Sequence, residues 1–256
     1  MQKYSIFNLI KNAFSGHQNW DLAWKDPTPK KEYDVVIIGG GGHGLATAYY
    51  LAKEHNITNV AIIEKGWIGG GNVGRNTTII RSNYMHDDNA LFSEFGMDLW
   101  RRMSQDLNYN VMFSPRGIIN LAHSDAQMNV YARRGNSMRL NGIDAVLLNR
   151  EEVKEIIPMA DFSDNVRFPI FGALMQPSAG TARHDAVAWG YARQADSMGV
   201  DIIQNCEVTG FDVVSGKIQG VRTSRGDIKV KKIGLCVAGS TNILAEKLNM
   251  TIPVET

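Results

Sequence analysis

Short apolar runs and helical repeats alternate along this chain from residue 33 onward. The run at 35–38 is rich in β-branched residues, which is typical of a buried parallel strand. Apolar positions over 45–52 then recur with the period of a helix, and a second apolar run covers 60–63. This order of strand, helix and strand predicts a βαβ unit, the building block of a parallel α/β sheet.

The loop between the first strand and the helix carries the pattern G-x-G-x-x-G, and an acidic residue ends the second strand. The first glycine permits a tight turn, the second lets a pyrophosphate approach the backbone, and the third lets helix and strand pack closely. The acid can accept hydrogen bonds from ribose hydroxyls. A purely structural loop is the less favoured alternative, so we predict an adenine dinucleotide site. Its expected residues are Gly39, Gly41, Gly42, His43, Gly44 and Glu64.

The rest of the pattern predicts an α/β chain. Leu91, Phe95, Leu99 and Met103 recur on one helical face and are expected in the core. Asn149 opens an Asn-x-x-Glu capping box. The expected helices are 86–107, 125–140, 150–157 and 185–198, and the expected strands are 117–122, 145–148, 172–176, 200–203, 208–213, 217–223, 227–230 and 233–238.

Composition and net charge argue against several classes of partner and ligand. A net charge of +1 over 256 residues argues against a nucleic-acid partner, and no apolar run approaches the ~20 residues that span a bilayer. Cys206 and Cys236 lack C-x-x-C spacing and the histidines lack ligand spacing, so we expect no zinc or other metal site. These features indicate a cytoplasmic protein. Residues 1–32 contain Trp20 and Trp24, and we expect this extension to pack on a partner or on its own domain.

A second glycine-rich loop follows Glu64 directly. Gly69, Gly70, Gly71 and Gly74 let the backbone approach a ligand closely, and a polar run then leads into Ile79–Arg81. A glycine-rich turn alone is usually only a turn. Since this one follows a ribose-binding position, we expect it to wrap around the cofactor.

Three further segments carry a family resemblance: RNTTIIRSNY at 75–84, RHDAVAW at 183–189 and LCVAG at 235–239. Together with the first βαβ unit they resemble FAD proteins of the D-amino-acid oxidase type. Within that class the chain resembles the β subunits of heterotetrameric sarcosine oxidases, over about residues 24–239. The resemblance implies a glutathione-reductase-like, FAD-binding Rossmann domain with an inserted α+β substrate lobe. The expected domains are the extension 1–32, a discontinuous FAD-binding domain 33–85 with 177–256, and part of the substrate lobe at 86–176.

The resemblance also implies an activity and a set of cofactors. Family members hold FAD non-covalently and FMN on a histidine, and they oxidise sarcosine to glycine. Electrons pass from FAD to FMN and then to O2, which gives H2O2. The one-carbon product is formaldehyde or methylenetetrahydrofolate. The expected partners are an α subunit that binds NAD and tetrahydrofolate, and the small γ and δ subunits.

Site residues follow from the family's matching positions. His184 matches the histidine that carries FMN, and Arg183 and Arg75 are expected beside it; the competing interpretation is a histidine at a helix start. Arg81 matches an arginine that pairs with the substrate carboxylate in monomeric relatives, against the alternative of a surface salt bridge. The further positions expected at FAD are Asn72, Thr78, Ile80, Val208 and Gly239.

Family members are considerably longer, so a truncated chain with weak flavin retention and little turnover is expected. Three alternatives stay open. The first is a related flavin amine dehydrogenase for dimethylglycine or a D-amino acid. The second is a non-catalytic flavin-binding subunit. The third, an NAD-dependent dehydrogenase, is disfavoured by the second glycine-rich loop and by the V-A-G segment.

Overall fold

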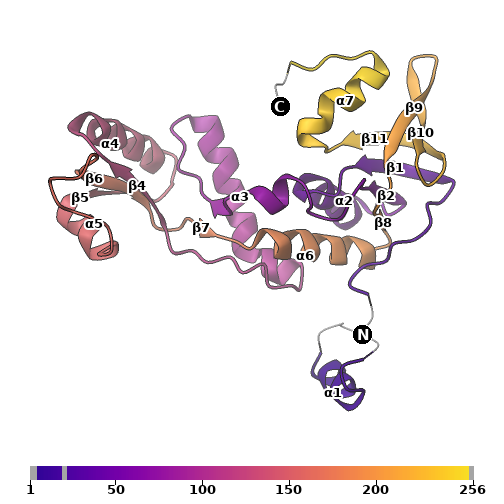
Figure 1. Cartoon of the computed structure of the whole chain (residues 1–256), viewed down its shortest axis with the longest axis horizontal. Coiled ribbons are helices and arrows are strands. Elements are labelled where there is room, and N and C mark those ends of the chain that lie inside the picture. Colours follow the sequence, from indigo (N-terminus) through magenta and orange to yellow (C-terminus); the bar gives the residue numbers. More distant parts are fainter. Residues whose placement is uncertain (1–4, 19–21, 254–256) are drawn as a thin grey trace. The chain divides into compact units, whose positions relative to one another are not determined.

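The computed structural model describes residues 5–18 and 22–253, and it divides the chain into two compact units (Figure 1). Unit 1 comprises Met1–Gly70 and Tyr191–Thr256, and unit 2 comprises Gly71–Gly190. The helix α6 (His184–Ser197) crosses the boundary between them.

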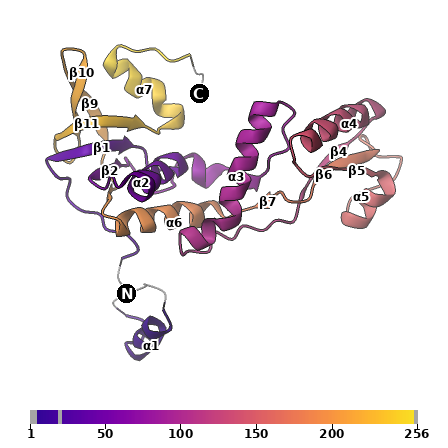
Figure 2. The same cartoon turned by 180° about the vertical axis from the view of Figure 1, so that it is seen from behind.

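Unit 1 is built on a six-stranded mixed sheet (Figures 1 and 2). Four strands run parallel and the last two return antiparallel, which confirms the predicted α/β class. In order across the sheet the strands are β8 (Asp201–Ile203), β2 (Val60–Ile63), β1 (Glu32–Ile38), β11 (Ile228–Leu235), β10 (Lys217–Thr223) and β9 (Val208–Val214). The remaining elements of the unit are α1 (Ile6–Phe14), α2 (Gly42–His55), η2 (Ala238–Ser240), α7 (Thr241–Ala245) and η3 (Glu246–Leu248).

Apolar burial holds this sheet together, because β2 is buried along its whole length and β1 is buried at Val36–Ile38, as their apolar runs require. Tyr33 at the start of β1 is fully buried, and its hydroxyl donates to Asp201 at 2.8 Å. On α2, Tyr49 meets Tyr191 edge to face, with ring centroids 5.4 Å apart. These contacts fix α2, and with it the loop that precedes it, against the strands.

One strand prediction is wrong. The runs at 227–230 and 233–238 were expected as two elements, but the structure has the single strand β11. Ile228 and Lys229 pair antiparallel with β10, while residues from Lys229 to Leu235 pair parallel with β1, so β11 connects the parallel and antiparallel parts of the sheet. Lys231 and Lys232 interrupt the apolar pattern, but their side chains are exposed and leave the backbone ladder intact.

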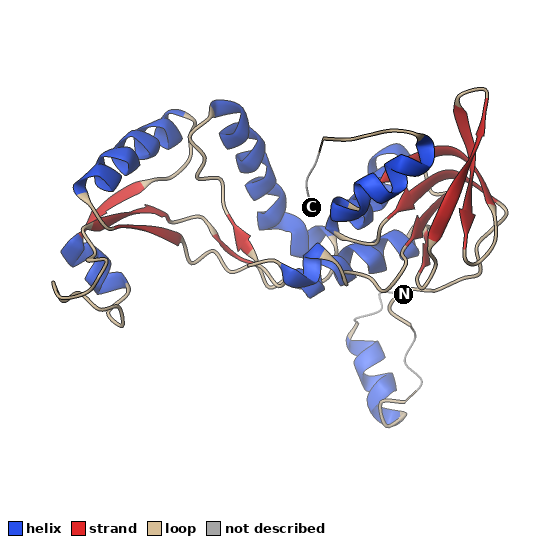
Figure 3. Cartoon of the chain, turned by 45° about the horizontal axis from the view of Figure 1, so that its top comes forward, coloured by secondary structure: helices blue, strands red, loops and turns tan. Residues whose placement is uncertain are grey.

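Unit 2 has a three-stranded antiparallel sheet in the order β4-β6-β5, seen in red among blue helices in Figure 3. Leu174 of the central strand packs with Met138 of α4, and its neighbour Ala173 packs with Val153 of α5. Successive side chains of β6 therefore point to opposite faces of the sheet and contribute to two separate hydrophobic clusters. The elements are η1 (Asn72–Arg75), β3 (Ile79–Ile80), α3 (Asp87–Asp106), β4 (Ile118–Ala122), α4 (Asp125–Leu140), β5 (Val146–Asn149), α5 (Arg150–Ile156), β6 (Gly172–Gln176) and β7 (Gly180–Thr181).

The predicted core face of α3 is only partly right. Met103 is buried, but Leu91 and Phe95 are 56% and 62% exposed. Ala90 and Met97 are buried instead, so the buried stripe of α3 is rotated away from the expected one. Periodicity alone cannot fix the phase when a helix has apolar residues on more than one face.

The predicted capping box at Asn149 is confirmed. The Asn149 side chain accepts from the Glu152 amide at 3.0 Å, and the Glu152 carboxylate accepts from the Asn149 amide at 2.7 Å. Replacing Asn149 with alanine leaves an orphan amide in the first turn of α5, so we expect a loss of about 1 kcal/mol of unfolding free energy. Urea unfolding of N149A would measure it, and a loss under about 0.3 kcal/mol would contradict the capping role.

The end of the N-terminal extension packs on its own domain. The Lys25 amide donates to Asp196 at 2.9 Å, and Asp26 pairs with Arg225 at 3.0 Å. Trp24 is partly buried, whereas Trp20 lies outside the described residues. Among the residues that the structure describes, no helix combines the length and apolarity needed to cross a membrane.

Candidate functional site

The turn after β1 in unit 1 can be made only by glycine at two positions. Gly39 has φ +108°, and a Cβ there would lie 2.3 Å from the Cys236 carbonyl oxygen. A Cβ at Gly44 would lie 2.0 Å from the Gly39 carbonyl oxygen. The first glycine therefore permits the turn and the third permits the close approach of α2 to the turn, as the motif predicts.

Backbone amides are left available where α2 begins. Gly41 is the N-cap and provides no side-chain acceptor, and the first helical hydrogen bond runs from the Leu45 amide to the Gly41 carbonyl at 3.0 Å. The amides of Gly42, His43 and Gly44 therefore have no acceptor within the helix. Together with the positive end of the helix dipole, they form a favourable place for a phosphate group.

Glu64 is held beside this turn by the backbone. Its two carboxylate oxygens accept from the Gly40 amide at 2.7 Å and from the Gly66 amide at 2.8 Å. Each oxygen retains lone pairs after one such bond. The carboxylate is thus fixed at the end of β2 and can still accept hydrogen bonds from a diol.

The V-A-G segment runs alongside the glycine turn. The Cys236 amide donates to the Ile38 carbonyl at 2.8 Å, so the chain after β11 lies next to the end of β1. Gly239 follows in the short η2 helix and is exposed. Val208 opens β9 and its side chain is in the core of unit 1. Burial raises the pKa of the Cys236 thiol, partly offset by a hydrogen bond with Thr47.

In unit 2, two segments far apart in sequence lie side by side. Ile79 and Ile80 of β3 pair antiparallel with Thr181 and Gly180 of β7. The Ala182 amide extends this contact by donating to the Thr78 carbonyl at 3.1 Å. The RNTTIIR segment is therefore joined by backbone hydrogen bonds to residues 180–182, which directly precede the RHDAVAW segment. Asn72 and Arg75 lie in the preceding η1 turn and are exposed.

Thr78 adopts a strained conformation at this junction. Its φ is +60°, which is unusual for a β-branched residue. The Asn76 side chain stabilises the turn by accepting from the Thr78 amide at 2.7 Å. Such strain is frequent where the chain positions a ligand.

His184 begins α6 next to an ion pair. Arg183 Nε donates to both carboxylate oxygens of Asp185, at 2.8 and 3.1 Å. Burial alone would raise the pKa of Asp185, but the hydrogen bonds from Arg183 and the Ala186 amide lower it below its ordinary value. Of the two ring nitrogens of His184, only Nδ1 is buried without a hydrogen-bond partner. The ring thus holds one buried polar atom whose hydrogen-bonding capacity is not used by the described residues.

Arg81 makes no ion pair with any residue that the structure describes. Its guanidinium lies over the Tyr84 ring, 5.0 Å from the centroid, and donates to the side chain of Asn83. The alternative of a surface salt bridge therefore has no support in the described part of the chain. The guanidinium retains donors for an anion.

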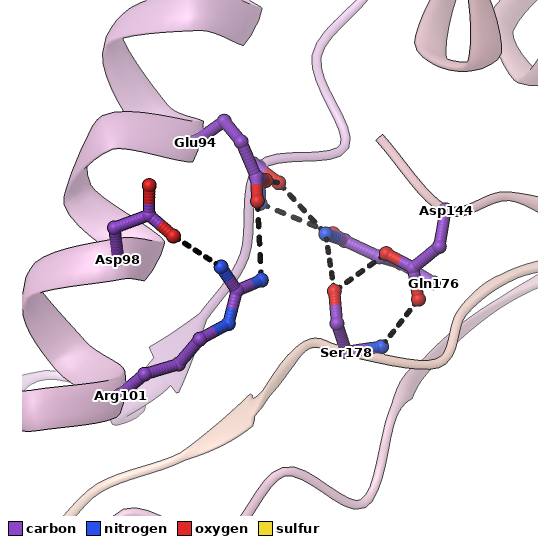
Figure 4. Close-up of polar contacts among 7 residues, drawn as sticks. Glu94, Asp98, Arg101, Asp144, Gln176 and Ser178 are labelled. Atoms are coloured by element: carbon purple, nitrogen blue, oxygen red, sulfur yellow. Dashed lines mark hydrogen bonds and ion pairs between the residues drawn. The ribbon is translucent and has the colours of Figure 1, made fainter. Parts of the chain in front are cut away.

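A buried polar network lies close by in unit 2 (Figure 4). Gln176 is fully buried; its carbonyl oxygen accepts from the Ser82 amide at 3.1 Å and its amide nitrogen donates to Ser82 Oγ at 2.7 Å. Ser82 Oγ donates in turn to Glu94 at 2.6 Å. The network joins β6 to α3 and to the segment that carries Arg81.

Replacing Gln176 with leucine should lower the unfolding free energy by about 3 kcal/mol, because buried groups of Ser82 lose their partners. Gln105→Leu is the matched control, since Gln105 is exposed on α3 and should change stability by under about 0.5 kcal/mol. Urea unfolding of both variants measures the difference, and equal losses would contradict a structural role for the network.

A family model described as FAD dependent oxidoreductase (DAO) matches residues 34–256. The chain belongs to the FAD-dependent oxidoreductases. Within this family, sarcosine oxidase subunit beta of Rhizobium meliloti is 58% identical over 99% of this chain. The protein of the same name from Rhodobacter capsulatus is 51% identical over 100% of it. The chain spans 61% of the length of each of these relatives.

Solved structures show the same fold. L-proline dehydrogenase from P. horikoshii superposes with a TM-score of 0.81 and 26% identity, covering 89% of this chain and 58% of that one. Glycine oxidase from Bacillus cereus superposes with a TM-score of 0.73 and 23% identity, covering 84% of this chain and 57% of that one.

The residues present fit a flavin dinucleotide. The glycine turn leaves space that any Cβ would fill, the amides at the start of α2 lack acceptors, and Glu64 is fixed nearby. For a second flavin the fit rests on the unpartnered, buried Nδ1 of His184. Within the described residues there is no cluster of His, Cys, Asp or Glu that could hold a metal.

The structure gathers the expected residues into two groups, one in each unit. Gly39–Gly44, Glu64, Val208 and Gly239 are in unit 1, and the other expected residues are in unit 2. Sequence reasoning did not find Asn83 or Arg134, which flank Arg81. Asn83 belongs to the RNTTIIRSNY segment but was assigned no role, and Arg134 belongs to no recognisable motif. The pairing of Arg183 with Asp185 was also missed, although the charge pattern around His184 contains it.

Proposed function

We propose that the chain is the flavin-binding part of a sarcosine oxidase β-type subunit, which catalyses oxidative demethylation of sarcosine to glycine. The observation that carries this proposal is the 58% and 51% identity, over essentially the whole chain, to two proteins named sarcosine oxidase subunit beta. The proposed one-carbon product is formaldehyde, or methylenetetrahydrofolate where folate traps the imine. The proposed location is the cytoplasm.

Each unit has a proposed role. Unit 1 is a glutathione-reductase-like FAD-binding domain, in which the amides at the start of α2 hold the pyrophosphate and Glu64 binds the ribose hydroxyls. The greater part of unit 2 belongs to a substrate lobe, where Arg81 holds the substrate carboxylate in a charge-assisted pair. His184 binds FMN covalently, with Arg75 and Arg183 nearby. Asn72, Thr78 and Ile80 contact FAD.

Bound FAD would supply a hydride acceptor for the N-methyl group, and FMN would supply the redox centre at which O2 is reduced to H2O2. Arg81 orients the substrate by its carboxylate, which raises the rate by restricting the geometry of the reacting carbon. The proposed partners are the α, γ and δ subunits of the heterotetramer. NAD and tetrahydrofolate belong to the α subunit in this scheme.

Anaerobic titration of the native assembly that contains this chain tests the proposal. Sarcosine should bleach the visible flavin absorbance, and readmitted O2 should restore it with release of H2O2. Bleaching by dimethylglycine, a D-amino acid or L-proline but not by sarcosine would replace the substrate assignment. No bleaching by any amine would indicate a non-catalytic subunit.

A further inference from the structure

Two arginines of unit 2 converge on one asparagine. Arg81 follows β3, and its Nη1 donates to the side-chain oxygen of Asn83. Arg134 is in the middle of α4, and its Nε donates to the main-chain oxygen of the same Asn83 at 2.7 Å, with Nη2 donating to that oxygen as well. Asn83 is 1% exposed, and its amide nitrogen donates to Asn120 at 2.8 Å. One oriented residue thus positions both guanidinium groups.

Neither arginine has a carboxylate partner. Among the described residues, no aspartate or glutamate forms an ion pair with Arg81 or Arg134. Other arginines of the same unit do find one: Arg101 pairs with Glu94 at 3.1 Å and Arg150 pairs with Asp164 at 2.9 Å. The two guanidinium groups at Asn83 therefore form a local excess of positive charge.

Partial burial strengthens the repulsion between these two positive charges. Arg81 and Arg134 are both partly buried, and burial followed by the nearby charge of Arg81 lowers the pKa of Arg134. Like charges in a poorly solvated place repel each other, and a bound anion removes that repulsion. After their bonds to Asn83, Arg81 keeps Nε and Nη2 and Arg134 keeps Nη1 as donors.

We propose that Arg81 and Arg134 together form one subsite for a single small carboxylate, with Arg134 as its second cation. The donors that remain suit the two oxygens of a carboxylate, and the ring of Tyr84 lies against the Arg81 guanidinium. Asn83 is a positioning residue, since it orients both arginines. That this anion is the carboxylate of the amine substrate rests on the proposed function, whereas the subsite rests on the geometry alone.

Binding of acetate, compared with neutral acetamide, tests the subsite by calorimetry on the purified chain. Arg134→Gln and Arg81→Gln should each weaken acetate binding at least about tenfold, since each removes a charge-assisted hydrogen bond. Acetamide should show no dependence on either arginine. Arg133→Gln is the matched control, because Arg133 is the exposed neighbour on α4 and should change affinity by less than about twofold. Unchanged acetate affinity in a folded R134Q variant would overturn the proposal.

A second measurement covers the case in which R134Q does not fold. Arg134→Lys keeps the positive charge but removes the guanidinium group that donates to the Asn83 carbonyl. The guanidinium signals that disappear from the nitrogen NMR spectrum of this variant are therefore those of Arg134. In the unmodified protein these signals and those of Arg81 should shift on addition of acetate, while those of Arg133 should not. Shifts confined to Arg81 would overturn the role of Arg134.

Kinetics of the native assembly separate this inference from the proposed function. If R134Q raises the KM for sarcosine with little change in kcat, Arg134 holds the substrate carboxylate. If sarcosine is oxidised with unchanged KM in R134Q, the subsite fails as a substrate site and the proposed function stands. If both arginines control acetate binding but no amine reduces the flavin, the subsite stands and the proposed function fails.

Discussion

Replacing Gly44 with alanine is expected to abolish FAD binding and to cost about 4 kcal/mol or more of unfolding free energy. The new Cβ would lie 2.0 Å from the Gly39 carbonyl oxygen and 3.3 Å from Ile37 Cγ2. The first contact is with backbone that is itself fixed, because the Gly39 amide donates to Ile63 at 2.8 Å. Relief therefore requires α2 to move away from β1, which would disrupt the packing of Leu45 and Tyr49, both buried.

Gly96→Ala is the control for this experiment. Gly96 is in the middle of α3, and a Cβ there meets nothing within 4 Å. The same substitution should therefore stabilise the protein by about 0.5–1 kcal/mol through helix propensity. Urea unfolding and titration with FAD would be measured for both variants. If G44A bound FAD with unaltered affinity and unfolded at the same urea concentration, the close approach of α2 to the turn would not be needed.

The contrast between these two glycines shows what the sequence can predict. Gly39, Gly44 and Glu64 belong to one continuous βαβ unit, so their spacing alone encodes the turn, the close approach and the acidic group. The boundaries of β2, α4 and β6 were predictable for the same reason, because apolar period and caps are local. Predictions from local sequence patterns were wrong where contacts with another helix or strand determine the structure.

The two wrong predictions, for the strand β11 and for the buried face of α3, both concern features that depend on contacts with a partner element. β11 is continuous because its pairing with β1 and β10 overrides two lysines in its middle. The exposed Leu91 and Phe95 have the same period as buried residues, and only the packed structure shows which stripe of α3 is covered. Propensity and period are short-range, whereas these outcomes depend on contacts with residues distant in sequence.

The residues of the candidate site likewise divide into those that a local sequence pattern reveals and those that only the packed structure reveals. His184 and Arg81 were found because they fall in segments that resemble a family. The backbone pairing of β3 with β7 then joins the first segment to the residues that directly precede the second. Arg134 has no such segment. It is one of several arginines on a polar helix, and its position beside Asn83 follows from how α4 packs on the sheet of unit 2. No pattern in the sequence distinguishes Arg134 from its neighbour Arg133.

Replacing His184 with alanine is expected to eliminate covalently bound flavin completely while leaving the chain folded. Nδ1 of His184 is buried without a partner, so removing the ring deletes an unsatisfied group and leaves no other residue without its hydrogen bond. The start of α6 is also held independently of the ring, by the Arg183–Asp185 pair and by the Asp185 carboxylate accepting from the Ala186 amide at 2.8 Å. The loss of flavin would therefore not be a consequence of unfolding.

His86→Ala is the matched control, because His86 is exposed, lies in the same unit, and forms no side-chain cap at the start of α3. Both variants would be produced in the native assembly, precipitated with acid and examined for flavin fluorescence in the protein band. We expect fluorescence in the unmodified protein and in H86A, and none in H184A. Non-covalent FAD released into the supernatant should be the same in all three, because the glycine turn and Glu64 are unchanged. Fluorescence that persisted in the H184A band would place the covalent bond on another residue and separate His184 from the redox chemistry.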